Sequence, residues 1–154
     1  MAIVSAKIIN AKNIEKALLN AFEEWAEKDV NEKHWEYQFK ERRWDYGEVV
    51  TVRKSGEVVG PGPRNIYDLG ALYKSGVDSY NFSPSLNGAE ASWHWNATNS
   101  SGREYASAVH YGTRFMDGRP FTDDISIPSS FFLKQPGKDL LSRVQTALDN
   151  ISAR

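Results

Sequence analysis

The chain contains no cysteine among its 154 residues. Disulfides, thiol nucleophiles and cysteine-based zinc sites are therefore excluded, and the composition fits a reducing compartment. Long apolar runs are lacking too. The opening stretch MAIVSAKIINAKNIEKALL is interrupted by Lys and Asn every few positions, unlike the continuous apolar centre of a signal peptide. We therefore expect a soluble protein of the cytoplasm with no membrane contact.

A dominant charge of either sign is also lacking. The 19 basic and 20 acidic side chains give a formal net charge of −1, so nothing global attracts the protein to DNA or to an anionic membrane. A basic cluster, KERR at 40–43, lies among aromatic residues, as is typical of nucleic-acid surfaces, but acidic residues frame it. We interpret this cluster as the solvated end of a helix, where cations suit the helix dipole.

The length and composition predict one compact domain over 1–154, because a chain of this size can bury a single core. Asn10 or Asn13 can cap a first helix. The apolar residues of this helix recur at spacings of three and four, which places them on one face; they are Ile14, Leu18, Leu19, Phe22, Trp25 and Ala26. The following stretch, 27–45, has weaker periodicity, so the helix continues, bends or restarts there.

Strand patterns fill the middle of the chain. The stretch 48–60 is rich in valine and has a turn signal at Ser55-Gly56, which predicts a short hairpin. Segments 77–82 and 89–95 are the next strand candidates, separated by SPSLNG. In the second of them Ala and Trp alternate with polar residues, a period of two that is typical of a half-buried strand. This alternation predicts that His94 points away from the tryptophans.

Short and long helices surround these strands. A brief helical turn is expected in 65–76, with Leu69, Leu72 and Tyr73 facing inward and Gly76 closing it. A short helix is expected in 103–112, ending at Gly112, and an amphipathic helix closes the chain over 138–151. The apolar positions of the closing helix are Leu140, Leu141, Val144, Ala147, Leu148 and Ile151.

These elements predict an α+β fold: a long N-terminal helix, an antiparallel β-sheet, a closing C-terminal helix and a long loop over 113–137. The loop contains three prolines and two glycines. A loop of this length within a compact domain usually has a function.

Catalysis needs groups that converge, and the sequence offers few. His34, His94 and His110 lack the spacing of paired metal ligands, and the neighbours Asp123 and Asp124 alternate across an extended backbone. No Gly-x-Ser-x-Gly element marks a nucleophile, and the prolines of GPGPRN remove amide donors that a phosphate loop needs. We therefore expect no enzyme and no cofactor, and keep a small metal-dependent hydrolase as an alternative.

Two stretches carry a family resemblance. RNIYDLGALYKSG, residues 64–76, contains Asp68, Gly70, Leu72 and Ser75. YASAVHYGTRFMDGRPF, residues 105–121, contains Tyr105, Ala106, Val109, Gly112, Thr113, Arg119, Pro120 and Phe121. Taken in this order, they resemble the Asp-x-Gly-x-Leu-x-x-Ser and Tyr-Ala-x-x-Val-x-x-Gly-Thr…Arg-Pro-Phe elements of small neck proteins of long-tailed bacteriophages, the head-tail connector or tail-completion family of HK97 type.

The resemblance implies a structural virion protein that forms a homo-oligomeric ring between the portal and the tail. The ring would seal this junction and let DNA pass along its axis. The expected partners are further copies of the chain, portal or adaptor proteins and tail proteins, and the expected location is the neck of the virion, assembled in the host cytoplasm. A tail terminator that caps the tail tube is the alternative within this class, and a cellular binding module is the alternative outside it.

Rings of this kind use heterologous contacts, in which each subunit gives one surface and receives another. We expect the loop to supply such a contact through Arg114, Phe115, Met116, Arg119, Phe121, Phe131 and Phe132. Apolar loop side chains either fold back onto the core or await a partner, and here we favour the partner. Arg119 can form an ion pair within its own chain or between subunits.

Overall fold

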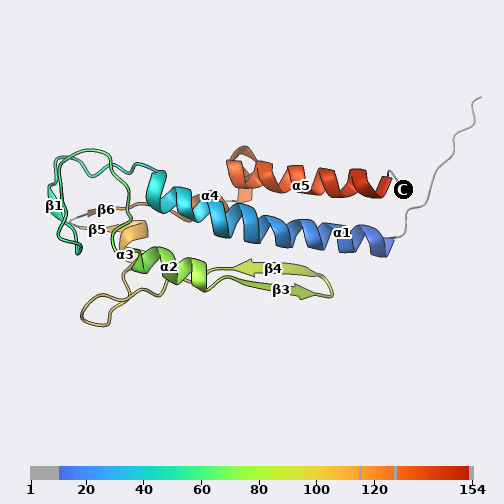
Figure 1. Cartoon of the computed structure of the whole chain (residues 1–154), viewed down its shortest axis with the longest axis horizontal. Coiled ribbons are helices and arrows are strands. Elements are labelled where there is room, and N and C mark those ends of the chain that lie inside the picture. Colours follow the sequence, from blue (N-terminus) through green and yellow to red (C-terminus); the bar gives the residue numbers. More distant parts are fainter. Residues whose placement is uncertain (1–10, 115, 127, 153–154) are drawn as a thin grey trace, which may run out of the picture.

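The computed structural model describes residues 11–114, 116–126 and 128–152. Helices dominate, and antiparallel strands form three small two-stranded sheets, so the predicted α+β class is confirmed. The molecule is elongated (Figure 1): its first and last helices lie side by side over one half, with one hairpin running alongside the first helix, and most of the short elements lie at the other end. We call this second end the motif end; it carries β1 (Thr51–Val52), α3 (Ala106–Tyr111), β5 (Gly112–Thr113) and β6 (Met116–Asp117).

The first helix continues through the charged stretch that follows its amphipathic part. Helix α1 (Ala11–Glu24) passes into two segments with π-helical hydrogen bonding, η1 (Trp25–His34) and η2 (Tyr37–Glu41). The residues that link these segments keep helical φ and ψ angles, so the helix neither stops nor restarts. It ends at Arg42, whose ψ of 134° turns the chain out of the helix.

The closing helix α5 (Gln135–Ser152) lies antiparallel to α1 (Figure 1). It begins three residues earlier than predicted, because its first turn contains Pro136, and proline fits the first turn of a helix. Gly137 approaches the preceding segment closely: a Cβ there would lie 2.2 Å from the Phe131 carbonyl oxygen. Leu141 is exposed, so its predicted place on the apolar face is wrong.

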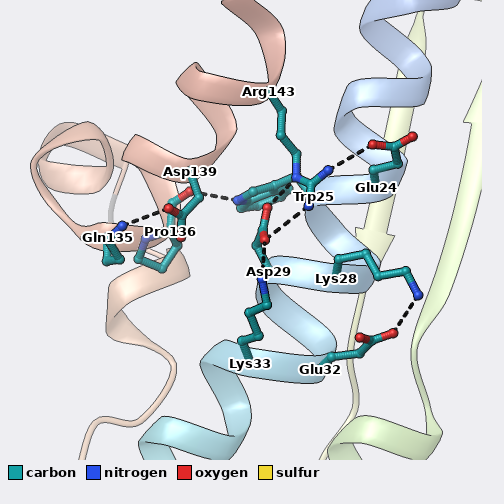
Figure 2. A network of polar contacts seen from close by, with 10 residues as sticks. All are labelled: Glu24, Trp25, Lys28, Asp29, Glu32, Lys33, Gln135, Pro136, Asp139 and Arg143. Atoms are coloured by element: carbon teal, nitrogen blue, oxygen red, sulfur yellow. Dashed lines mark hydrogen bonds and ion pairs between the residues drawn. The ribbon is translucent and has the colours of Figure 1, made fainter. Parts of the chain in front are cut away.

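Polar contacts join the two long helices where they cross (Figure 2). The Arg143 guanidinium donates to both carboxylate oxygens of Asp29, and its Nη1 donates to Glu24 Oε2 at 2.8 Å. The buried Trp25 indole donates to the Pro136 carbonyl at 2.7 Å. Desolvation raises the pKa of Asp29, but hydrogen bonds from Arg143 and Lys33 outweigh it, so its pKa lies below the usual value.

The strands form three separate antiparallel hairpins, β1–β2, β3–β4 and β5–β6. Strands β1 (Thr51–Val52) and β2 (Val58–Val59) confirm the predicted valine hairpin, which turns at Gly56 with a φ of 87°. Strand β5 (Gly112–Thr113) begins one residue before the expected loop, and β6 (Met116–Asp117) lies within it.

The central hairpin differs in its limits from the prediction. Strands β3 (Asn81–Ser85) and β4 (Gly88–Ser92) pair in register Phe82 to Ala91, whereas strands were expected over 77–82 and 89–95. The first strand starts later because a helix occupies 77–78. It also continues through Pro84, since a two-stranded ribbon has open edges where a proline costs no ladder hydrogen bond.

Helix α2 (Ala71–Asp78) extends past Gly76, so the prediction that Gly76 ends it is wrong. The glycine serves packing instead: a Cβ at Gly76 would lie 2.1 Å from Trp95 Nε1. Leu72 is buried as predicted, but Leu69 is exposed. The close contact between Gly76 and Trp95 therefore fixes this helix against the tryptophan segment.

The expected loop over 113–137 is largely folded. Besides β5 and β6 it contains α4 (Asp123–Ser126) and the 3₁₀ segment η3 (Pro128–Leu133). Helix α3 (Ala106–Tyr111) precedes it and ends at Gly112 with a φ of 81°, as predicted. The idea of one long irregular loop is thus wrong, because the segment folds back onto the core rather than extending from it.

The core consists of two neighbouring aromatic clusters. One joins the buried Trp25 and Trp35 of the first helix to α5 and the central hairpin, and the other joins Phe39 to Leu72 and Phe121 at the motif end. Trp95 belongs to both, with its ring 4.9 Å from that of Trp35 and 5.3 Å from that of Phe121. The first helix therefore contributes side chains to both core clusters.

Within the described residues, no helix has the length and apolar character needed to span a membrane.

Candidate functional site

The two stretches that carry the resemblance lie against each other at the motif end. Asp68, which precedes α2, accepts hydrogen bonds from the backbone N–H groups of Lys54 at 2.8 Å and Ser55 at 3.4 Å. Desolvation raises its pKa, but these hydrogen bonds outweigh it and hold the pKa below the usual value. Asp68 thus fixes the β1–β2 turn beside the start of α2.

Gly70 begins α2 in a conformation that favours glycine. Its φ is 82°, and a Cβ would lie 2.6 Å from the Tyr67 hydroxyl oxygen. The Ser75 hydroxyl donates to the Leu72 carbonyl at 2.8 Å, within the helix. These four residues therefore shape the start of the helix and its packing; they are Asp68, Gly70, Leu72 and Ser75.

The second stretch packs onto the same core cluster. Tyr105, Ala106 and Val109 lie against it from α3. Burial raises the pKa of the Tyr105 hydroxyl, with a smaller contribution from the Asp68 charge. At Gly112 a Cβ would lie 2.5 Å from both Gly118 N and Met116 O, so the absent side chain lets β5 and β6 fold tightly beside the helix.

The Arg-Pro-Phe element, residues 119–121, stabilises the motif end through contacts within its own chain. The Arg119 backbone N–H donates to the Val109 carbonyl at 2.8 Å. The Phe121 ring is 1% exposed and touches the rings of Phe39, Trp95 and His110. Arg119 and Phe121 were expected to contact a partner, but both side chains are buried in their own chain.

Arg119 uses an aromatic ring where an ion pair was expected. Its Cζ lies 3.7 Å from the Tyr46 ring centroid, and Arg64 Cζ lies 3.9 Å from the same centroid. Two guanidinium groups this close must lie on opposite faces of the ring, in a cation–π stack. Arg64 also donates to the carbonyls of Val59 and Gly60, so the stack ties the valine hairpin to Arg119.

A cleft of about 280 Å³ opens where the two stretches meet. Phe39, Leu72 and Val109 contribute apolar surface, Tyr67 and Tyr105 add aromatic rings, and Asp68, Lys54 and Asn99 are its polar residues. Lys54 Nζ lies 5.6 Å from the centroid of the Tyr105 ring. We call this opening the motif cleft; its mainly apolar lining suits an apolar side chain with polar contacts at the rim.

Exposed apolar side chains surround the motif end. They are Val49, Val50, Val52, Val58, Leu69 and Tyr111, each more than half exposed. Four of them come from the β1–β2 hairpin and the residues leading into it. Clustered exposed apolar residues indicate a contact surface rather than a solvated loop, and sequence reasoning missed the hairpin as a source of such a surface.

The remaining expected contact residues fall into several places. Arg114 is exposed and Met116 partly exposed in the β5–β6 hairpin; Thr113 pairs with Met116 there, and Pro120 follows β6. Phe115 lies outside the described residues. Phe131 packs edge-on against Trp25 with ring centroids 5.8 Å apart, whereas Phe132 is 53% exposed. Phe132 therefore remains available to a partner, and Phe131 serves mainly the core.

The three histidines lie in different surroundings. His94 is exposed, as predicted, while His110 Nε2 lies 3.3 Å from Asp123 Oδ1. Asp123 and Asp124 lie in α4 and not in extended chain, which corrects the prediction. Across the described ranges, no three His, Cys, Asp or Glu side chains are grouped to hold a metal ion.

A buried polar cluster around Gln38 was not found from the sequence. The Gln38 amide donates to Asp124 Oδ2 at 2.7 Å and lies 3.3 Å from His34 Nε2, while its carbonyl accepts from Arg42 at 2.9 Å. Lys134 completes the cluster through Asp124 Oδ1 at 2.7 Å. Residues 34, 38 and 42 share one helix face by their spacing of four, the only signal that the sequence offered.

The cluster holds His34 neutral. The amide nitrogen of Gln38 can only donate, so His34 Nε2 must be the unprotonated acceptor. Burial lowers the pKa of His34 to about 4, although the Asp124 charge acts in the opposite direction. This arrangement joins the first helix to α4.

A comparison with protein-family models, curated proteins and solved structures finds no match to this chain.

Proposed function

We propose that this chain is a structural virion protein that forms a ring at the neck of a long-tailed bacteriophage, between the portal and the tail, and lets DNA pass. The observation that carries the proposal is the meeting of the two resembling stretches. They are separated by almost thirty residues in the sequence, yet they line one cleft and pack on one core cluster.

The surroundings of the cleft favour assembly over turnover. Asp68, Gly70 and Gly112 stabilise backbone turns in the two stretches. Arg119 and Phe121 are buried and pack within their own chain. Exposed valines flank this end, which fits a protein whose surface is completed by neighbours. Function would thus reside in contacts between subunits and not in a reactive group.

The charge balance suits a channel for DNA. A lumen that bound phosphates tightly would oppose passage of the genome, and the formal net charge of −1 provides no such attraction. A tail terminator, which caps the tail tube before joining, shares these features and is the alternative within the proposal.

The test begins with the DNA on either side of the gene. The proposal predicts genes for capsid or portal proteins on one side and tail-tube proteins on the other. Particles of that phage, labelled with a gold-conjugated antibody against this chain, should carry label at the head-tail junction. Metabolic neighbours with no virion gene nearby, or unlabelled particles, would contradict the proposal.

A further inference from the structure

The tip of the central hairpin carries an apolar side chain that is exposed to solvent. Leu86 forms the turn between β3 and β4 and is 98% exposed. The turn is braced, because the Ser85 hydroxyl donates to the Gly88 carbonyl at 3.2 Å. An exposed leucine at the end of a braced hairpin is a side chain available for insertion into an apolar site.

The base of this hairpin is held against the first helix. Phe82 lies with its ring 5.8 Å from that of Phe22, and Ala91 packs against the core cluster of Trp25 and Trp35. The direction of the tip is therefore set by the core. In Figure 1 the hairpin points toward the end where α1 begins, away from the motif end.

We propose that Leu86 of one copy inserts into the motif cleft of the next copy, so that hairpin tip and cleft form the repeating contact of the ring. This inference rests on the proposed function. The tip and the cleft lie at opposite ends of an elongated molecule, and a contact between two different surfaces is the kind that generates rings when the rotation closes.

Charge complementarity supports the same pairing. Glu90 is the one charged residue between Tyr80 and Trp93, and it is exposed on β4. Lys54 is exposed at the rim of the cleft, and among the described residues its ammonium has the Tyr105 ring as its contact and no carboxylate. With Leu86 in the cleft, Glu90 follows at about 10 Å along the strand, within reach of the long Lys54 side chain.

Crosslinking tests the contact directly, since the chain has no cysteine of its own. Leu86→Cys combined with Leu69→Cys, at the rim of the cleft, should give a ladder of dimers, trimers and larger species with a short bismaleimide. Leu86→Cys combined with Leu141→Cys, an exposed leucine on α5, is the matched control. The reaction is run on the full chain at high concentration and on virions that carry the variants.

Charge exchange provides a second measurement. Lys54→Glu and Glu90→Lys alone should each weaken self-association by about threefold to tenfold, the range of a partly exposed ion pair turned repulsive. The double variant should regain most of this loss. Thermal unfolding should change little in all three, because both side chains are exposed.

The outcomes separate the two proposals. Virions that contain the chain but give no more ladder from the cleft pair than from the control would overturn the contact and leave the neck function standing. Absence of the chain from virions would overturn both. A cleft-specific ladder together with rescue by the double variant would support the contact.

Discussion

Contacts of single side chains stabilise the motif end. Arg119 and Phe121 illustrate the limit of sequence reasoning: an arginine and an aromatic beside a proline suit either a partner or the core. The structure buries both, with Arg119 stacked on Tyr46. No pattern in the sequence pairs residues 46 and 119, because a stack between distant segments leaves no local periodicity.

The His34 pKa predicts a pH dependence of stability. The unfolded state binds a proton near pH 6.5, whereas the folded state does so only at about 4. Stability is therefore full above pH 6.5 and falls as the pH drops toward 4, by on the order of 3 kcal/mol. Urea unfolding between pH 7 and pH 4 measures this slope.

His34→Gln should flatten that slope, while His94→Gln, at an exposed position, should leave it as in the parent. The groups facing His34 are Asp124, Asp139, Arg42 and Lys134. An unchanged slope in His34→Gln would show that the histidine does not set the pH dependence.

Gly76 is predicted to tolerate no side chain. A Cβ would lie 2.1 Å from Trp95 Nε1, so Gly76→Ala must displace a ring shared by both core clusters and should cost about 1–3 kcal/mol. Gly60→Ala is the control, since a Cβ there meets open space. Equal melting temperatures for the two variants would rule out this role for Gly76.

At the scale of elements, helices were predicted better than strands. The spacing of Ile14 to Ala26 and of Leu140 to Ile151 located the two long helices, since an amphipathic face repeats over several turns. The hairpins were placed less well, because strands of two to five residues carry little periodicity. The folded segment 113–137 was missed because its short elements are held by contacts with distant residues.

The pairing of α1 and α5 depends on a partly buried ion cluster. Arg143→Met should lower stability by about 1–2 kcal/mol, because it leaves Asp29 without its main cation. Lys28→Met removes an exposed pair with Glu32 and should cost at most about 0.5 kcal/mol. Thermal unfolding at low and at high salt measures the stability of both variants. A larger loss of stability from Lys28→Met than from Arg143→Met would contradict the role assigned to Arg143.

At the scale of the whole molecule, apolar side chains are exposed at two separate places. The exposed valines and the motif cleft lie at one end, and Leu86 lies at the tip of a hairpin that points to the other. The sequence indicated a family resemblance and predicted a contact surface on 114–132, and that surface stays a prediction. The exposure of the hairpin tip could not be predicted from the sequence, because it depends on how the hairpin packs on the first helix.

Leu86→Asp should weaken self-association at least about tenfold, since it places a charge in an apolar cleft. The folded chain should be unaffected, because the side chain is 98% exposed. Sedimentation velocity over a range of concentrations measures the change, and Leu133→Asp, at another exposed leucine, is the control. Equal association of both variants would argue against the hairpin tip.

The most direct measurement is electron microscopy of lysates from a phage in which this gene has been deleted. The neck assignment predicts filled heads and free tails of normal length that fail to join, with joining restored by the gene supplied in trans. Tails of abnormal length would indicate the terminator instead. Normal yields of joined, infectious particles without the gene would contradict the proposed function.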